Sequence, residues 1–379
     1  GDLVLKEVAL RLQSCVKKHD IICRMGGDEF TIAIGNQISA EAAAETSVRV
    51  AERILKELGR PYVLNDREVF LSGSIGVAIY PHDASTATEL LKNADMAMYH
   101  SKETGRNKVQ FYTQAMNQKA VELLELENDL RHALVRNELE VYYQPQYSAS
   151  NGRAVAAEAL LRWNHPSKGI IPPVVFIPII EDTGLIVPVG LWVLEQACTQ
   201  FMQWQSEGFG LSRIAVNVSV RQFKQDEFLD NVRDVIARTG ILPCQLELEL
   251  TESILIDDLD HTLNVLRSLG DMGVRTAIDD FGTGYSSLNY LKQFPVDVLK
   301  IDRSFIQNLP DNKDDAQITR TIIAMAHNLG LGVIAEGVET QAQLDFLNQA
   351  NCEEVQGYLF NKPLRAVEFA EKMRQANQA

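Results

Sequence analysis

The sequence lacks three features, and each absence excludes a class of protein. Its five cysteines are scattered, with no CxxC pair and no Cys/His spacing typical of zinc sites, which excludes a disulfide framework and a zinc site. Acids outnumber bases, and the net charge of −15 argues against a general surface for duplex nucleic acid. No long apolar run is unbroken, because prolines and acids interrupt even the segment 169–194, so no membrane span is predicted.

The remaining composition is that of a globular protein with reduced core thiols, which favours a cytoplasmic location. The chain opens without Met, within a helical apolar rhythm, and shows no signal peptide. We therefore expect it to be part of a longer protein, in which upstream segments would supply any sensory region or membrane anchor. A length of 379 residues predicts two domains.

Residues 1–112 predict a compact α/β domain. Apolar residues recur at helical spacing over 3–18, 41–58 and 86–102, and a strand pattern lies within 69–80. Two further strands, 20–24 and 30–34, frame a turn that contains two glycines and two acids. From the residues alone the turn has two interpretations: a loop whose glycines admit a phosphate and whose acids hold a cation, or an ordinary hairpin tip.

Three motifs in this part resemble the GGDEF domain, the diguanylate cyclase family. They are RMGGDEF at 24–30, SIGVAIYPHD at 74–83 and ADMAMYHSKETGRNKVQFY at 94–112. The resemblance implies a nucleotide and metal site with Gly26, Gly27, Asp28, Glu29, Lys102 and Arg106. Family members also use a metal-binding Asp and phosphate contacts upstream of the point where this sequence starts. We therefore expect a partial, regulatory GGDEF domain with GTP as its candidate ligand.

A helical connector is predicted at 113–138. Leucines and valines recur at helical spacing through 116–136 and are interleaved with acids and arginines. This pattern indicates a helix that packs on a domain with one face and exposes a charged face to water.

From residue 139 onward, eight units repeat, each with an apolar strand, a polar or acidic residue at its end and a helical stretch. The strands are predicted at 139–143, 154–157, 214–216, 246–250, 276–278, 298–301, 332–335 and 354–356. The repeat predicts an α/β fold, a (β/α)8 TIM-like barrel over 139–376. Functional groups of such barrels lie at the carboxyl ends of the strands, where this sequence places Glu158, Asn217, Glu249, Asp279, Asp280, Lys300, Glu336, Glu339 and Gln356.

The strand 276–278 leads directly into Asp279 and Asp280, followed by the loop 282–288. Successive strand residues point to opposite faces, so both carboxylates cannot be buried in one core, and the pair belongs at an open strand end. Gly282 and Gly284 permit tight turns, and a Ser-Ser pair is placed to cap a following helix. Taken alone, the pair is either a metal site or a solvated turn. Many acids on one rim repel each other unless cations lie among them, and oxygen ligands suit Mg²⁺ or Mn²⁺.

Seven motifs in this half resemble the EAL domain, the cyclic di-GMP phosphodiesterase family: EALLRW at 158–163, NVS at 217–219, ELTES at 249–253, DDFGTGYSSL at 279–288, KIDRSF at 300–305, EGVET at 336–340 and QGY at 356–358. The resemblance implies hydrolysis of cyclic di-GMP to linear pGpG with two Mg²⁺ or Mn²⁺ ions. It implies as metal ligands Glu158, Asn217, Glu249, Asp279, Asp280 and Glu336. It implies as substrate contacts Gln144, Leu161, Arg162, Glu339 and Gln356.

The resemblance implies a catalytic set of Glu336, Lys300, Glu249 and Asp279. In this set, Glu336 is the candidate base that deprotonates the attacking water. Lys300 would steady that water or the developing charge, and its alternative is a salt bridge to one of the acids. Glu252 is expected to brace the loop 281–287.

Two other functions stay open from the sequence: a receptor that binds cyclic di-GMP without cleaving it, and a bifunctional cyclase and phosphodiesterase in the full-length protein. The resemblance also implies a homodimer.

Overall fold

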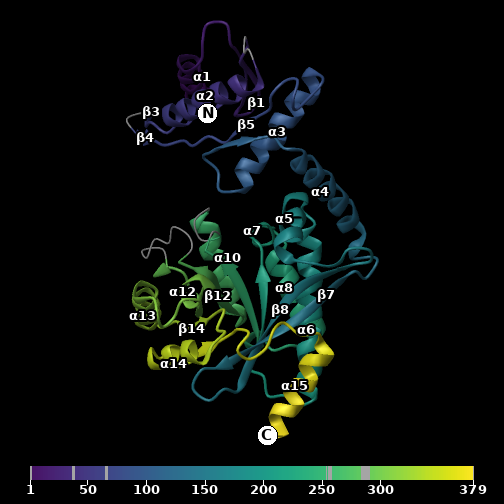
Figure 1. Cartoon of the computed structure of the whole chain (residues 1–379). Helices are drawn as coiled ribbons and strands as arrows, with labels where there is room; N and C mark the ends of the chain where they lie inside the picture. Colours follow the sequence, from purple (N-terminus) through teal and green to yellow (C-terminus); the bar gives the residue numbers. More distant parts are fainter. Residues whose placement is uncertain are drawn as a thin grey trace. The chain divides into compact units, whose positions relative to one another are not determined.

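The computed structural model describes residues 2–35, 39–64, 67–252, 254, 258–282 and 291–378. The chain divides into two compact units, Gly1–Leu126 and Glu127–Ala379 (Figure 1).

In its described residues, the first unit has three two-stranded sheets and the helices α1, α2 and α3, and it also contains the first part of α4. Its elements are α1 (Asp2–Cys15), β1 (Ile21–Gly26), β2 (Glu29–Ala33), α2 (Ala40–Leu58), β3 (Tyr62–Leu64), β4 (Arg67–Val69), β5 (Ile75–Val77), α3 (Ala87–Glu103) and β6 (Val109–Phe111). The predicted helices and the predicted hairpin, β1–β2, are confirmed. Of the strand pattern in 69–80, Val69 ends β4 and residues 75–77 form β5, which pairs in parallel with the three-residue β6.

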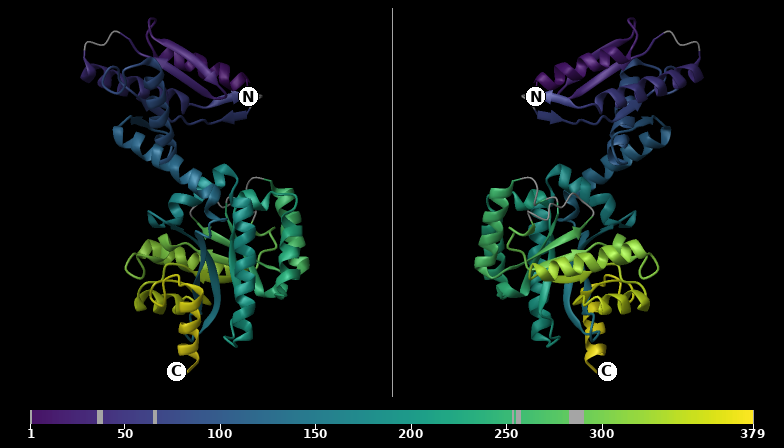
Figure 2. Two further views of the ribbon diagram at one scale, coloured as in Figure 1. Left: turned by 90° about the vertical axis from the view of Figure 1, so that its right-hand side faces the viewer. Right: turned by 90° about the vertical axis from the view of Figure 1, so that its left-hand side faces the viewer.

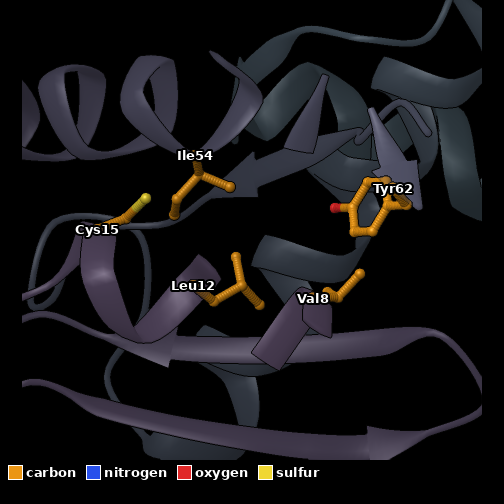
Figure 3. Close-up of a cluster of buried hydrophobic side chains, with 5 residues drawn as sticks. All are labelled: Val8, Leu12, Cys15, Ile54 and Tyr62. Atoms are coloured by element: carbon orange, nitrogen blue, oxygen red, sulfur yellow. The ribbon is translucent and has the colours of Figure 1, made fainter. Parts of the chain in front are cut away.

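The core of the first unit forms between α1 and α2 (Figure 3). Val8, Leu12 and Cys15 recur at helical spacing on one face of α1 and pack with Ile54 of α2 and Tyr62 of β3. Burial raises the pKa of the Cys15 thiol. Cys198 and Cys352 are also buried, whereas Cys23 and Cys244 are exposed, so the expectation of core cysteines holds for three of the five.

The helix α4 (Gln114–Ala133) leads into the second unit. The strands there are β7 (Leu139–Ser148), β8 (Ala154–His165), β9 (Gly169–Ile171), β10 (Arg213–Val218), β11 (Leu246–Thr251), β12 (Arg275–Phe281), β13 (Val298–Ile301), β14 (Gly332–Ala335) and β15 (Glu354–Val355). The helices are α5 (Pro173–Thr183), α6 (Ile186–Ser206), α7 (Val220–Phe223), α8 (Phe228–Thr239), the 3₁₀ turn η1 (Pro243–Gln245), α10 (Leu259–Met272), α12 (Arg303–Ile306), α13 (Lys313–Asn328), α14 (Gln341–Gln349) and α15 (Ala366–Gln378).

Eight of these strands close into a barrel, which confirms the predicted fold. The order β10-β11-β12-β13-β14-β15-β7-β8 is closed by pairing of β10 with β8, while β9 extends β8 outside the ring. Helices surround the strands (Figure 2). No helix in the described part of the chain is long and apolar enough to cross a membrane.

One strand departs from a regular (β/α)8 barrel: β7 runs antiparallel to both neighbours, β8 and β15. The repeat of strand and polar end carries no information on strand direction. The length of the connecting loop does indicate the direction. Only residues 149–153 separate β7 from β8, and a parallel crossover needs a dozen or more residues.

Candidate active site

Strand register brings the predicted rim residues to one level of the barrel. Gln144 of β7 lies opposite Glu158 of β8, and Glu158 in turn lies opposite Ala215 of β10. Two residues further along β10, Asn217 lies opposite Glu249 of β11. Asn217 Nδ2 donates a hydrogen bond of 2.7 Å to Glu158 Oε1, which joins the two neighbouring strands at this level.

Lys300 of β13 lies at the centre of this acidic rim and is fully buried. Its Nζ is 2.7 Å from a carboxylate oxygen of Glu249 and 2.7 Å from one of Glu336. It also lies 3.2 Å from Asp279 and 3.8 Å from Glu158. The sequence analysis offered a salt bridge between Lys300 and one acid as an alternative role. The structure shows ion pairs of this ammonium with four carboxylates.

The positive charge of Lys300 compensates the negative charges of the surrounding carboxylates. Burial disfavours its ammonium, but the four carboxylates outweigh burial and raise the pKa of Lys300 well above its usual value. Burial, with the neighbouring acids, raises the pKa of Glu249 well above its usual range and that of Glu336 to about 8. Burial also acts on Glu158, yet Lys300 and the amides of Gln356 and Asn217 leave the pKa of Glu158 below its usual value.

Asp279 and Asp280 occupy a bulge in β12. The register with β13 shifts by one residue between Ile278 and Phe281, and Asp280 adopts the left-handed φ of 54°. The pair divides as the sequence predicts: Asp279 is buried and Asp280 is exposed. One oxygen from each of Asp279, Asp280 and Glu336 lies within 4.8 Å of the others.

The carboxylates of Asp279, Asp280 and Glu336 fit a divalent cation, because hard cations prefer oxygen ligands. Asn217, at the end of the neighbouring β10–β11 pair, would add an amide oxygen. Among the described residues, the buried Glu249 Oε1 has no hydrogen-bond partner, and a buried carboxylate oxygen of that kind is stabilised by a cation.

A second group of predicted residues lies beside Glu158. Gln356, directly after β15, donates from Nε2 to Glu158 Oε2 and to Gln144 Oε1, the latter at 3.1 Å. Arg162 of β8 is partly buried, its Nη1 donates to the carbonyl of Leu161 at 2.8 Å, and burial lowers the pKa of its guanidinium. The structure therefore gathers Gln144 and Gln356 around Glu158 and fixes Arg162 further along the same strand.

Two predicted residues lie elsewhere on the rim. Glu252 accepts a hydrogen bond of 3.3 Å from the Gly282 backbone N–H, at the start of the loop that it was expected to brace. Gly284 and the Ser-Ser pair of that loop lie outside the described residues. The exposed Glu339 pairs with Arg303 at 2.9 Å, and the structure does not bring it into the Lys300 cluster.

Comparison with protein-family models identifies the family of this barrel. Residues 127–363 match the family model of the EAL domain. The chain belongs to the EAL domain family. Residues 1–108, ahead of the EAL domain, match the model described as diguanylate cyclase, GGDEF domain, so the predicted tandem is confirmed.

Two curated relatives align with nearly all of the chain. The bifunctional diguanylate cyclase/cyclic di-GMP phosphodiesterase MucR of Pseudomonas aeruginosa is 47% identical over 366 residues, which are 97% of this chain and 53% of the relative. The cyclic di-GMP phosphodiesterase PdeR of Escherichia coli is 38% identical over 369 residues, 97% of this chain and 55% of the relative. The chain therefore spans about half the length of these relatives.

Solved structures match the EAL domain itself. A structure described as PaMucR phosphodiesterase in a c-di-GMP complex is 47% identical, with a TM-score of 0.63, and covers 65% of this chain and 99% of that one. The EAL enzyme Bd1971, in a form bound to cAMP and cyclic di-GMP, is 31% identical with a TM-score of 0.66, covering 77% of each chain.

The predicted nucleotide residues of the GGDEF unit are all exposed. Gly26 and Glu29 end and begin the two hairpin strands, Gly27 and Asp28 form the turn, and Gly27 has a φ of 50°. Arg24 donates from Nε and Nη2 to the Gly27 carbonyl at 3.0 and 2.6 Å, which fixes the turn. Lys102 lies in the last turn of α3, and Arg106 follows with a φ of 54°.

The sequence interpretation missed the residues beneath the rim of the EAL domain. Gln146 and Arg213 are buried one level below Glu158, and neither belongs to a motif quoted above. A signal did exist: Gln144 and Gln146 are two residues apart on one strand and so share a face.

Proposed function

We propose that the EAL domain hydrolyses cyclic di-GMP to linear pGpG with the help of divalent cations. The observation that carries this proposal is the cluster of four carboxylates around Lys300, in a domain 47% identical to a phosphodiesterase solved with c-di-GMP. A receptor that only binds the dinucleotide would not need this many acids at such short distances.

Two Mg²⁺ or Mn²⁺ ions, when bound, would neutralise phosphate charge and lower the pKa of a water molecule. The residues proposed to hold them are Glu158, Asn217, Glu249, Asp279, Asp280 and Glu336, of which Asp279, Asp280 and Glu336 have oxygens within 4.8 Å of one another. Glu336 is the proposed base, and it acts only while ionised. The Lys300 ammonium at 2.7 Å favours the ionised state, burial opposes it and raises the pKa to about 8, and bound cations would favour ionisation further. Arg162 is proposed to bind a substrate phosphate, with Gln144, Leu161, Gln356 and Glu339 as further contacts.

The remaining features are proposals about the whole protein. The GGDEF unit, assigned to 1–112 and joined by a connector at 113–138, would regulate the EAL domain at 139–376 by binding GTP. A homodimer in the cytoplasm is the proposed working form.

The test is incubation of the purified chain with cyclic di-GMP and Mg²⁺ or Mn²⁺, with and without EDTA, and separation of pGpG by chromatography. We expect pGpG only with cations, and a loss of rate of more than about 100-fold in Glu158→Ala, since even partners of metal ligands cost 10–100-fold. Glu371→Ala, an exposed acid on α15, is the matched control and should behave like wild type. Tight binding without turnover would instead identify a receptor.

A further inference from the structure

A continuous hydrogen-bonded chain runs through the barrel interior below the active site. Arg213 Nη2 donates to Gln146 Oε1 at 3.3 Å, and Gln146 Nε2 donates to Gln356 Oε1 at 3.0 Å. Gln356 Nε2 then donates to Glu158 Oε2. Two side-chain amides thus connect a guanidinium at the start of β10 to a carboxylate of the rim.

The chemistry at the ends fixes the direction of this chain. Arg213 can only donate, so Gln146 must present its oxygen downward and its NH₂ group upward. Gln356 must then accept with its oxygen, which leaves its NH₂ group for Glu158 and Gln144. Gln144 is oriented in the same sense, since its own NH₂ group donates to the Asn361 backbone carbonyl at 3.1 Å.

The anchor of the chain is rigid. Arg213 forms two hydrogen bonds with Glu354, at 3.1 and 2.6 Å, and lies 2.9 Å from Glu247. Gln146 is fully buried and Gln356 is 5% exposed, so water does not replace a lost partner. An amide turned the wrong way would leave buried donors and acceptors unsatisfied, which disfavours the flipped arrangement.

We propose that Gln146 is a positioning residue: it transmits the orientation set by Arg213 to Gln356, so that the Gln356 amide always donates to Glu158. Gln146 itself touches none of the rim carboxylates. Without Gln146, the buried oxygen of the Gln356 amide has no donor. The amide is then held only by its two acceptors, Glu158 and Gln144, and loses the contact that fixes its position below them. The proposal deepens the proposed function, because its kinetic readout rests on hydrolysis.

The experiment is a double-mutant cycle with Gln146→Met, Gln356→Met and the double variant. Each is measured for kcat and KM with cyclic di-GMP, and for Mn²⁺ binding by calorimetry without substrate. We expect Gln356→Met to lower kcat and Mn²⁺ affinity by about 10- to 100-fold, the usual effect of removing a partner of a metal ligand. Gln146→Met should lower both by about 3-fold or more and by no more than Gln356→Met, because it acts through Gln356. The double variant should be no worse than Gln356→Met, because Gln146 acts through Gln356.

Two controls separate positioning from packing. Gln205→Met removes a comparable amide hydrogen bond, from Gln205 to the Leu211 carbonyl on the outside of the barrel, and should leave kcat and Mn²⁺ affinity unchanged. If Gln146→Met does not fold, Gln146→Glu replaces it in the cycle. The Gln146→Glu carboxylate still accepts a hydrogen bond from Arg213 but has no N–H group to donate to Gln356. The measurement is made at pH 8.5 so that this carboxyl group is ionised.

Wild-type kcat and Mn²⁺ affinity in Gln146→Met would overturn the proposal. Losses that multiply in the double variant would also overturn it, because they would show that Gln146 acts independently of Gln356. A wild-type chain without hydrolysis would refute the proposed function instead, and the Mn²⁺ arm would still decide the role of Gln146.

Discussion

Replacing Lys300 with methionine removes the only cation that contacts four buried or partly buried carboxylates in the described rim. Each of its two 2.7 Å contacts represents about 6 kcal/mol of Coulomb attraction at an effective dielectric constant near 20. Desolvation of the ammonium offsets several kcal/mol of this. Removal of one partner of a buried ion pair leaves uncompensated charge, and the expected net loss of stability is about 3–5 kcal/mol.

The assay is thermal unfolding of Lys300→Met in EDTA at pH 8, followed by tryptophan fluorescence. All three tryptophans, Trp163, Trp192 and Trp204, lie in the barrel unit, so the signal reports on that unit alone. For a domain of this size 1 kcal/mol corresponds to about 2–4 °C, which predicts a fall in Tm of roughly 6–20 °C.

Mn²⁺ should restore more stability to Lys300→Met than it adds to wild type, because the cation supplies the positive charge that the variant lacks. Exposed Lys372→Met on α15 is the matched control and should unfold like wild type. The reasoning is refuted if Lys300→Met is as stable as wild type in EDTA at pH 8, or if Mn²⁺ stabilises the two proteins equally.

Three further predictions concern other residues of the chain. In EDTA the barrel should lose stability as pH rises from about 5 to 8, because the folded-state pKa of Glu336, about 8, exceeds the unfolded value near 4.3 and the folded state binds more protons in that window. The free energy of unfolding should change by at most about 1.4 kcal/mol per pH unit for one such group. Glu336→Gln should reduce this pH dependence in urea titrations; a dependence as steep as that of wild type would argue against Glu336 as its source. GTP added to the hydrolysis assay should change kcat or KM, and Glu29→Ala should abolish the change; an unaffected rate would mark the GGDEF unit as inert. Glu252→Ala should reduce kcat, because the Gly282 N–H loses its acceptor, while unfolding in urea shifts by only about 1 kcal/mol; wild-type kcat would contradict this.

The sequence predicts the barrel and its rim well because both follow from local patterns. A strand end followed by an acid can be recognised without tertiary information, and this places Glu158, Glu249 and Glu336 at one edge. Asp279 and Asp280 were expected to divide between a core and an open end, and they do so through a bulge.

The features that the sequence interpretation missed depend on distance in space. Lys300 contacts acids on four other strand ends, and no spacing along the chain encodes that convergence. The chain from Arg213 through Gln146 to Gln356 joins β10, β7 and the end of β15, whose side chains meet inside the barrel only after it closes. The roles of these residues toward cations and substrate stay predictions until the variants are measured.

The reversed strand β7 determines where the chain enters the barrel. Leu139, its first residue, pairs with Trp163 near the carboxyl end of β8, the end that carries the acidic rim. In a barrel of parallel strands, the first strand would begin at the opposite end, away from the functional groups. The polypeptide that arrives from α4 therefore joins the barrel on the side of the acidic rim. Only residues 134–138 separate the end of α4 from β7, so this helix leads directly to the rim end of the barrel along the chain.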